Sequence, residues 1–285
     1  MSELDLGQLQ DTLLLFGGPY SNLQAILALR QRAEQLQIAP GNIICTGDSV
    51  AYCAQPNETL KLIREWGIAL LMGNCEESLA FNAEDCGCGF ETGSTCDLLS
   101  DDWYRFASTT VEQQHKQWMG ALPRRIRFLY QGKDFIVIHG GVTQINQFIF
   151  ASTDERIKLE QIQLAQAAGV IAGHCGLPFT QPLQGKLWHN PGVIGMPAND
   201  GTTQGWYSLW KPAGDKIRIE HHKIRIEHHR LHYNAAGAKH HMLSAGLNNG
   251  YAEALTSGLW PSMDVLPDYE RVRQGKKIGE NSLLF

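Results

Sequence analysis

Five short apolar runs in the first two thirds of the chain have the length and the β-branched content of buried strands. They cover residues 13–16, 42–48, 68–72, 135–138 and 170–172. Two segments with the pattern of amphipathic helices, at about 22–37 and 56–66, separate the first three runs. A strand–helix–strand–helix–strand order predicts parallel strands joined by right-handed crossovers, and therefore an α/β fold.

Polar side chains follow four of these runs at the point where each strand should end. They are Asp48, Asn74, His139 and His174, and each has a glycine beside it. Because ligands bind outside the carboxyl ends of strands in open α/β sheets, these four side chains are candidates for one site. Two oxygens with two nitrogens suit Mn, Fe or Zn better than Mg or Ca. In the alternative, Asp48 and Asn74 cap helices and each histidine is a core residue. A metal site is favoured because all four side chains follow the ends of buried strands.

The later chain predicts a helix at 103–122, a hairpin of 125–131 with 133–138, and a helix at 153–168. Strands at 187–188, 193–194 and 206–210 are expected to form a second, antiparallel sheet. A helix should follow Asn234 to about residue 243. The apolar stretch 246–267 should cover the domain or a neighbouring subunit, and the charged stretch 268–281 should be solvated and mobile.

One heptapeptide, Lys-Ile-Arg-Ile-Glu-His-His, occurs twice in a row, at 216–222 and 223–229. Each copy alternates as a half-buried strand does. A shift of seven residues reverses strand parity, so a hairpin near His221 and His222, or a bulge, should separate the copies. The histidine pairs could bind a metal, but no other ligand type accompanies them. We therefore interpret the repeat as a duplicated surface strand.

The overall composition predicts a globular protein and narrows its partners. The 24 Lys and Arg residues against 29 Asp and Glu give a net charge of −5, which does not support nucleic-acid binding. No apolar run approaches the ~20 residues of a membrane span. The first residues lack the basic and apolar regions of a signal peptide, which predicts a cytoplasmic protein. We expect a main domain at 1–233, with a Gly- and Cys-rich insertion at about 82–100, and a helical extension at 234–285.

The seven cysteines are an odd number, and without a signal peptide they are interpreted as reduced thiols. Cys86, Cys88 and Cys96 could tie their loop to a zinc ion. Their spacing is not a standard zinc spacing, and a flexible reduced loop bordering the pocket is favoured. Cys75 and Cys175 flank candidate ligands. They are either small fillers or additional ligands that would favour Zn or Fe.

Several short motifs occur together in a fixed order. They are Gly47-Asp48, Gly73-Asn74-Cys75-Glu76, His139-Gly140, Gly173-His174-Cys175-Gly176 and Asn190-Pro191-Gly192. Over about residues 13–210 the chain resembles the calcineurin-like metallophosphoesterases, in particular their small bacterial and archaeal phosphodiesterase-like branch. The resemblance implies a two-sheet α/β sandwich flanked by helices. It also implies that Asp48, Asn74, His139 and His174 hold one of the family's two metal ions.

Departures from the family pattern fall on the other ion. Gly18 and Tyr20 stand where the family has its first Asp and His, and Gly176 stands where it has its last His. The resemblance therefore implies a degenerate first site and one retained ion of Mn, Fe or Zn. Tyr20 and Asn22 are candidates for substrate binding.

The function expected from this resemblance is hydrolysis of a small phosphomonoester or phosphodiester by metal-activated water. Asp48, Asn74 and Cys75, which replaces the family's leaving-group histidine, are the candidate catalytic residues. Further candidates for phosphate contact are Arg124, Arg125 and Arg127. The alternative is a retired member of the same fold that binds a metal and a phosphate or nucleotide without turnover. The extension could also form a homo-oligomer.

Overall fold

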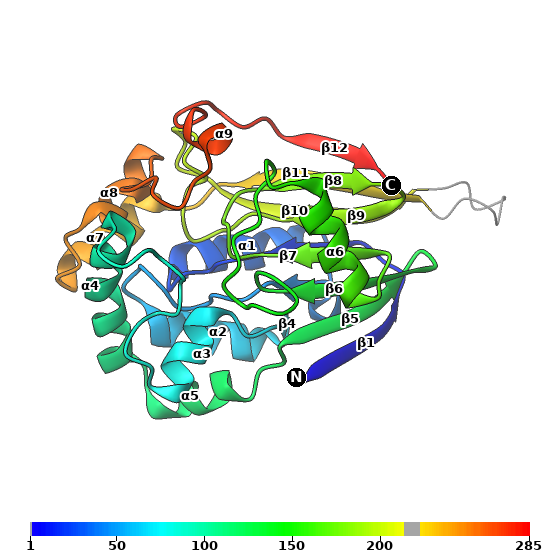
Figure 1. The fold of residues 1–285 in the computed structure, drawn as a ribbon. Coiled ribbons are helices and arrows are strands. Elements are labelled where there is room, and N and C mark those ends of the chain that lie inside the picture. The colour runs from blue at the N-terminus through cyan, green and yellow to red at the C-terminus, as the bar shows by residue number, and fades with distance from the viewer. Residues whose placement is uncertain (1, 214–222) are drawn as a thin grey trace.

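Two six-stranded mixed sheets pack face to face in the computed structural model, which describes residues 2–213 and 223–285 (Figure 1). In spatial order the first sheet contains β1 (Glu3–Leu9), β5 (Arg125–Tyr130), β6 (Lys133–Ile138), β7 (Gly169–Ala172), β9 (Lys186–Asn190) and β8 (Phe179–Leu183). The second contains β12 (Asn281–Leu284), β11 (Lys223–Leu231), β10 (Gly205–Ala213), β2 (Leu13–Phe16), β3 (Ile43–Cys45) and β4 (Ala69–Leu70). The expected two-sheet α/β sandwich is confirmed.

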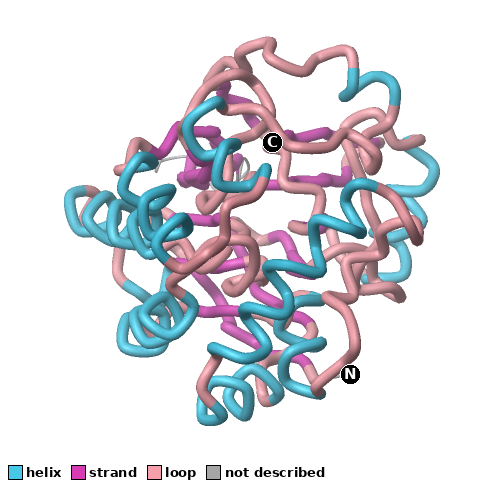
Figure 2. The backbone as a smooth tube through the Cα atoms, turned by 90° about the vertical axis from the view of Figure 1, so that its left-hand side faces the viewer, coloured by secondary structure: helices cyan, strands magenta, loops and turns pink. Residues whose placement is uncertain are grey.

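Helices cover the outer faces of this sandwich (Figure 2). They are α1 (Leu23–Gln35), α2 (Pro56–Trp66), α3 (Asn74–Phe81), α4 (Thr95–Thr110), α5 (Gln113–Gly120), α6 (Glu155–Ala165), α7 (Ala235–Ser244), α8 (Gly250–Ser257) and the short α9 (Asp268–Arg271). A 3-10 turn, Pro40–Asn42, precedes β3. In the described part of the chain, no helix is both long enough and apolar enough to cross a membrane.

The central strands are apolar on both faces because both faces are covered. In β2, Leu13 and Leu15 point into the core between the sheets, whereas Leu14 and Phe16 point toward the helices. β2, β3 and β4 are parallel, as the strand and helix order predicts. Their carboxyl ends consequently lie at one edge of the sheet.

Two predictions about the elements are wrong. Residues 103–122 form two helices, because Val111 and Glu112 are extended, with ψ of 123° and 146°, and α5 begins at the next residue. The strands at 187–188 and 206–210 do not share a separate antiparallel sheet. β9 runs parallel to β7 in the first sheet, β10 pairs with β2 in the second, and residues 193–194 make only an isolated bridge from Val193 to Gly17.

The second copy of the repeat, β11, is an inner strand and not the surface strand we expected. It lies between β10 and β12, and Ile224 and Ile226 are buried between the sheets. His228 is also buried, and its Nε2 lies 2.7 Å from Oγ1 of Thr180. The first copy, at 216–222, lies outside the described residues, as does the expected turn near His221.

The helix predicted after Asn234 is confirmed as α7, which Asn234 caps. The charged stretch 268–281 is more tightly held than we predicted. Glu270 is buried and accepts hydrogen bonds from the backbone N–H and the hydroxyl of Ser152. The guanidinium of Arg230 donates to the carbonyl of Ile278, and β12 then pairs with β11. Specific polar partners therefore fix a segment whose composition suggested only solvation.

The sulfurs of Cys86 and Cys88 are joined as a disulfide, which corrects the expectation of seven reduced thiols. Gly87, with φ of +63°, turns the chain between them. Cys96 lies on α4 and remains a free thiol. Among the residues that the structure describes, no group able to hold a metal includes a cysteine, so the loop shows no zinc cluster.

Candidate metal centre

The loop after β3 carries Asp48 to the edge of the second sheet. Gly47 has φ of +96°, and a Cβ there would lie 2.8 Å from the backbone nitrogen of Gly73 and 2.9 Å from Nδ1 of His139. Only glycine combines this conformation with such close contacts. The buried Asp48 follows with φ of +57°. The local sequence thus brings a carboxylate within reach of residues from the other sheet.

Glu76, in the first turn of α3, fixes this loop. One of its carboxylate oxygens accepts hydrogen bonds from the backbone N–H groups of Asp48 and Gly73, both at 2.8 Å, and the other accepts from the N–H and the hydroxyl of Ser49, both at 2.5 Å. Sequence reasoning quoted Glu76 in a motif but gave it no role. An acidic residue at the third position of a helix that follows a strand is a capping-box signal, and this signal could have identified it.

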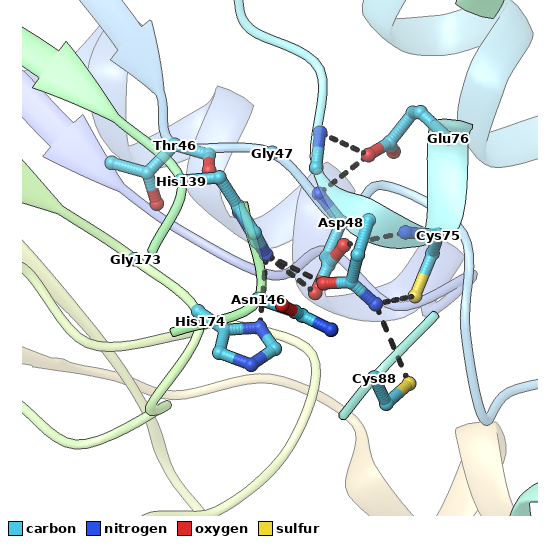
Figure 3. A network of polar contacts seen from close by, with 12 residues as sticks. Thr46, Gly47, Asp48, Cys75, Glu76, Cys88, His139, Asn146, Gly173 and His174 are labelled. Atoms are coloured by element: carbon cyan, nitrogen blue, oxygen red, sulfur yellow. Dashed lines mark hydrogen bonds and ion pairs between the residues drawn. The ribbon is translucent and has the colours of Figure 1, made fainter. Parts of the chain in front are cut away.

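His139, directly after β6, lies at the middle of the group (Figure 3). Its Nδ1 lies 2.7 Å from the carbonyl oxygen of Thr46. Because a carbonyl only accepts, Nδ1 carries a proton, and Nε2 points to the other side. Nε2 lies 3.1 Å from Oδ2 of Asp48, 2.9 Å from Oδ1 of Asn74 and 3.2 Å from Nδ1 of His174.

The other polar atoms of Asp48 and Asn74 are held from outside the group. Oδ1 of Asp48 accepts the backbone N–H of Cys75 at 3.2 Å, which leaves Oδ2 facing His139. Nδ2 of Asn74 donates to the carbonyl of Cys86 at 3.0 Å, so the amide oxygen must face inward. The protein therefore orients two oxygen acceptors toward the ring nitrogen of His139.

The oxygens of Asp48 and Asn74 that face Nε2 of His139 favour a positive charge at this nitrogen. Burial raises the pKa of Asp48, but the charge and hydrogen bond of His139 lower it more, and it lies below its ordinary value. Burial lowers the pKa of His139, but Asp48 raises it above its ordinary value. Burial and the neighbouring His139 lower the pKa of His174 to about 3. A proton on Nε2 of His139, or a metal ion, supplies the charge that the oxygens require.

The residues present can hold a metal ion. Ligand atoms of Asp48, His139 and His174 lie within 4.8 Å of one another, and this is the group able to hold a metal in the described chain. The Nδ1–H bond of His139 to a backbone carbonyl is typical of a metal-binding histidine. Nε2 of His174 is buried and makes no hydrogen bond of ordinary geometry, although backbone groups of Asn146 and Cys88 lie near the ring.

Of the two residues predicted to bind substrate, one lies beside this centre and the other does not. Tyr20 is buried and lines the cavity beside Asp48. Asn22 does not reach it, because its side chain accepts the N–H of Ala25 and donates to the carbonyl of Gly195 as the cap of α1. The structure thus places Asn22 as a helix cap outside the residues that line the cavity, and its role in substrate binding stays a prediction.

Two glycines, Gly18 and Gly176, were expected to leave space where a second ion would lie. A Cβ on Gly18 would lie 2.4 Å from the ring of Tyr20, and a Cβ on Gly176 would lie 3.4 Å from the indole of Trp260. Aromatic side chains of this protein therefore occupy the space beside both glycines.

The two flanking cysteines and the three arginines lie outside the metal-binding group. Burial raises the pKa of Cys75, and it raises that of Cys175 to about 12. Both thiols are therefore protonated near neutral pH. Three arginines have other partners and do not line the cavity: Arg124 pairs with Glu77, Arg125 donates to the carbonyl of Val142, and Arg127 pairs with Glu3 and Asp134.

A sequence model of the calcineurin-like phosphoesterase superfamily domain matches residues 22–209, which is more than half of the chain. The chain belongs to the calcineurin-like phosphoesterase superfamily. The matched range contains Asp48, Asn74, His139 and His174. It ends before α7 and α8, which this member of the superfamily packs against the second sheet and the helices that cover it.

Similar proteins support the same fold for this superfamily member. The protein MJ0912 of Methanocaldococcus jannaschii is 24% identical over 218 residues, which cover 70% of this chain and 82% of that protein. A metallophosphoesterase from Sphaerobacter thermophilus matches in structure with a TM-score of 0.65, 20% identity, and coverage of 88% of this chain and all of that one. The protein PH1004 of Pyrococcus horikoshii matches with a TM-score of 0.71, 12% identity, and coverage of 88% and 99%.

Proposed function

We propose that this protein is a metal-dependent phosphoesterase that hydrolyses a small phosphomonoester or phosphodiester with one retained ion. The observation that carries the proposal is the convergence of Asp48, Asn74, His139 and His174 on one point, in a chain of the phosphoesterase superfamily. When bound, an ion of Mn, Fe or Zn supplies Lewis-acid activation of water and of a phosphoryl oxygen.

The protein's own residues prepare this point for the ion and the substrate. The carbonyl of Thr46 holds the proton of His139 on Nδ1 and leaves Nε2 free to act as a ligand once its own proton has left. Glu76 holds Asp48 in place through the backbone. Burial raises the pKa of Tyr20 well above its ordinary value, so this phenol stays protonated and can donate a hydrogen bond to a phosphoryl oxygen.

The test is metal analysis and hydrolysis on the purified, full-length protein. Protein stripped with a chelator and reloaded with Mn, Fe, Zn, Co or Ni should hold one equivalent and hydrolyse bis(4-nitrophenyl) phosphate. Asp48→Asn should lose the ion and at least ~100-fold in kcat/KM, because changing even the partners of a metal ligand costs about 10–100-fold and Asp48 is itself a candidate ligand. Asp154→Asn, at the exposed cap of α6, is the matched control and should keep both. No turnover with any of the five metals would refute the proposal, and two equivalents would mean that further ligands exist.

A second candidate is a binding protein without turnover. General acids work best with a pKa near the working pH, and Cys75 and Tyr20 both have raised pKa values. His174, with a pKa of about 3, is also unsuited to protonate a leaving group at neutral pH. A phosphorylated ligand recovered intact from purified protein that hydrolyses no phosphoester would favour this function.

A further inference from the structure

A cavity opens beside the candidate metal centre, and Asp48 and His174 form its polar end. Most of its remaining wall is aromatic or aliphatic. The rings are Tyr20, Tyr52, Phe90, Phe148, Tyr251 and Trp260. The cavity has a volume of about 70 Å³, whereas one water molecule requires only about 10–15 Å³. A small organic group can therefore lie next to the metal centre.

The rings are in contact with the centre itself. Phe148 lies against the imidazole of His174, with ring centroids 4.2 Å apart, and Phe90 is stacked on Phe148 at 6.4 Å. On α8, Tyr251 lies 4.3 Å from Tyr52, whose ring lies 4.8 Å from Tyr20. Such offset and edge contacts are the geometries that a further aromatic ring can join.

Trp260 closes this wall from the C-terminal part of the chain. Its backbone N–H donates to Oδ1 of Asn199 at 2.8 Å, and its indole Nε1–H donates to the carbonyl of Pro197 at 2.7 Å. Because both donors are already satisfied, the indole offers the cavity only its carbon surface. Trp260 and Tyr251 lie beyond residue 209, where the superfamily match ends, so the C-terminal segment supplies two of the six rings of this wall.

The described residues that line the cavity include no lysine and no arginine. The phosphoryl group of a ligand would therefore meet positive charge only at the metal centre. A second or third phosphate would find no cationic side chain among these lining residues, and an unpaired charge is costly to bury. The wall therefore disfavours polyphosphates.

We propose that the phosphoester bound at this centre carries one phosphoryl group and an uncharged aromatic group, which lies against Phe148 and Trp260. The inference rests on the proposed function, because it places the phosphoryl group on the metal. It names a class of substrate that the metal centre alone does not determine.

The test compares phenylphosphonate with methylphosphonate as inhibitors of diester hydrolysis by the Mn²⁺-loaded protein. Phenylphosphonate should bind roughly three- to tenfold more tightly, the range that a ring contact adds, and inorganic triphosphate should bind no better than phosphate. Trp260→Ala should lower the phenyl-to-methyl ratio, because it removes one of the two ring contacts, and leave the methylphosphonate constant unchanged. Trp260→Phe should restore the ratio. Tyr269→Ala, an exposed aromatic outside the cavity, should not alter it.

The two proposals fail in different ways. If hydrolysis occurs but both phosphonates bind equally, or if Trp260→Ala leaves the ratio unchanged, the aromatic-substrate inference is overturned and the phosphoesterase stands. If no phosphoester is hydrolysed, calorimetry with the two phosphonates replaces inhibition. A phenyl preference that Trp260→Ala lowers then supports the cavity inference, although the absence of hydrolysis has refuted turnover, and equal binding of the two phosphonates overturns the cavity inference.

Discussion

Acidification should destabilise this protein through two histidines buried between the sheets. His189 is fully buried, with Nε2 2.8 Å from the hydroxyl of Ser208 and Nδ1 2.8 Å from that of Thr180. The same Thr180 hydroxyl lies 2.7 Å from Nε2 of His228. Burial lowers the pKa of His228 to about 3, and burial and His228 lower that of His189 well below its ordinary value. Both rings are therefore neutral in the folded protein.

The direction and size of the effect follow from these pKa values. An unfolded histidine has a pKa near 6.5, so between pH 6.5 and about 3 the unfolded state binds a proton at residue 228 that the folded state does not bind. The free energy of unfolding must therefore fall as the pH falls through this window. Between pH 7 and pH 5, His228 alone should remove about 2 kcal/mol, and His189 should add to this loss.

The assay is urea unfolding at pH 7 and pH 5, with a chelator present so that metal binding does not contribute. Between these pH values the natural protein should lose about 2 kcal/mol more than His228→Gln. His240→Gln, at an exposed histidine of α7, should behave as the natural protein does. Equal losses for the natural protein and His228→Gln would refute the reasoning, and so would a His228 imidazole that titrates near pH 6.5 in folded protein by NMR.

Three further predictions concern the metal centre and its borders. Glu76→Ala should lower the free energy of unfolding by about 3 kcal/mol or more, because it leaves buried N–H donors without their charged acceptor. If urea unfolding shows that this free energy falls by less than about 1 kcal/mol, the prediction is wrong. Denatured protein should react with a thiol reagent at five cysteines before reduction and seven after it, and seven from the start would mean that Cys86 and Cys88 are reduced. Metal affinity should rise with pH, and binding should release a proton, because the raised pKa of His139 lets a proton compete with the ion. Calorimetry in buffers of different ionisation enthalpy would detect the released proton. A metal affinity that does not change with pH would contradict the prediction.

The sequence was sufficient to predict the elements that depend on local pattern. The parallel order of β2, β3 and β4 followed from apolar runs that alternate with amphipathic helices. The meeting of Asp48, Asn74, His139 and His174 followed from their positions at strand ends. Strand length and order determine such features, and both can be read along the chain.

Features that depend on distant partners could not be predicted in this way. β8 contains Pro182 and polar residues, and it is a strand because β9 supplies its hydrogen bonds at the edge of the sheet. The short strand β12 exists because β11 is beside it. Trp260 reaches the cavity only because Asn199 and Pro197 bind it. No local pattern contains this information.

The candidate metal centre draws two of its side chains from each half of the sandwich. Asp48 and Asn74 follow strands of the second sheet, whereas His139 and His174 follow strands of the first. An ion held by all four side chains would link the two sheets. Because it would bind only the folded protein, its binding would raise the free energy of unfolding. Conversely, a distant substitution that shifted one sheet relative to the other would weaken metal affinity, even though it changed none of the four ligands.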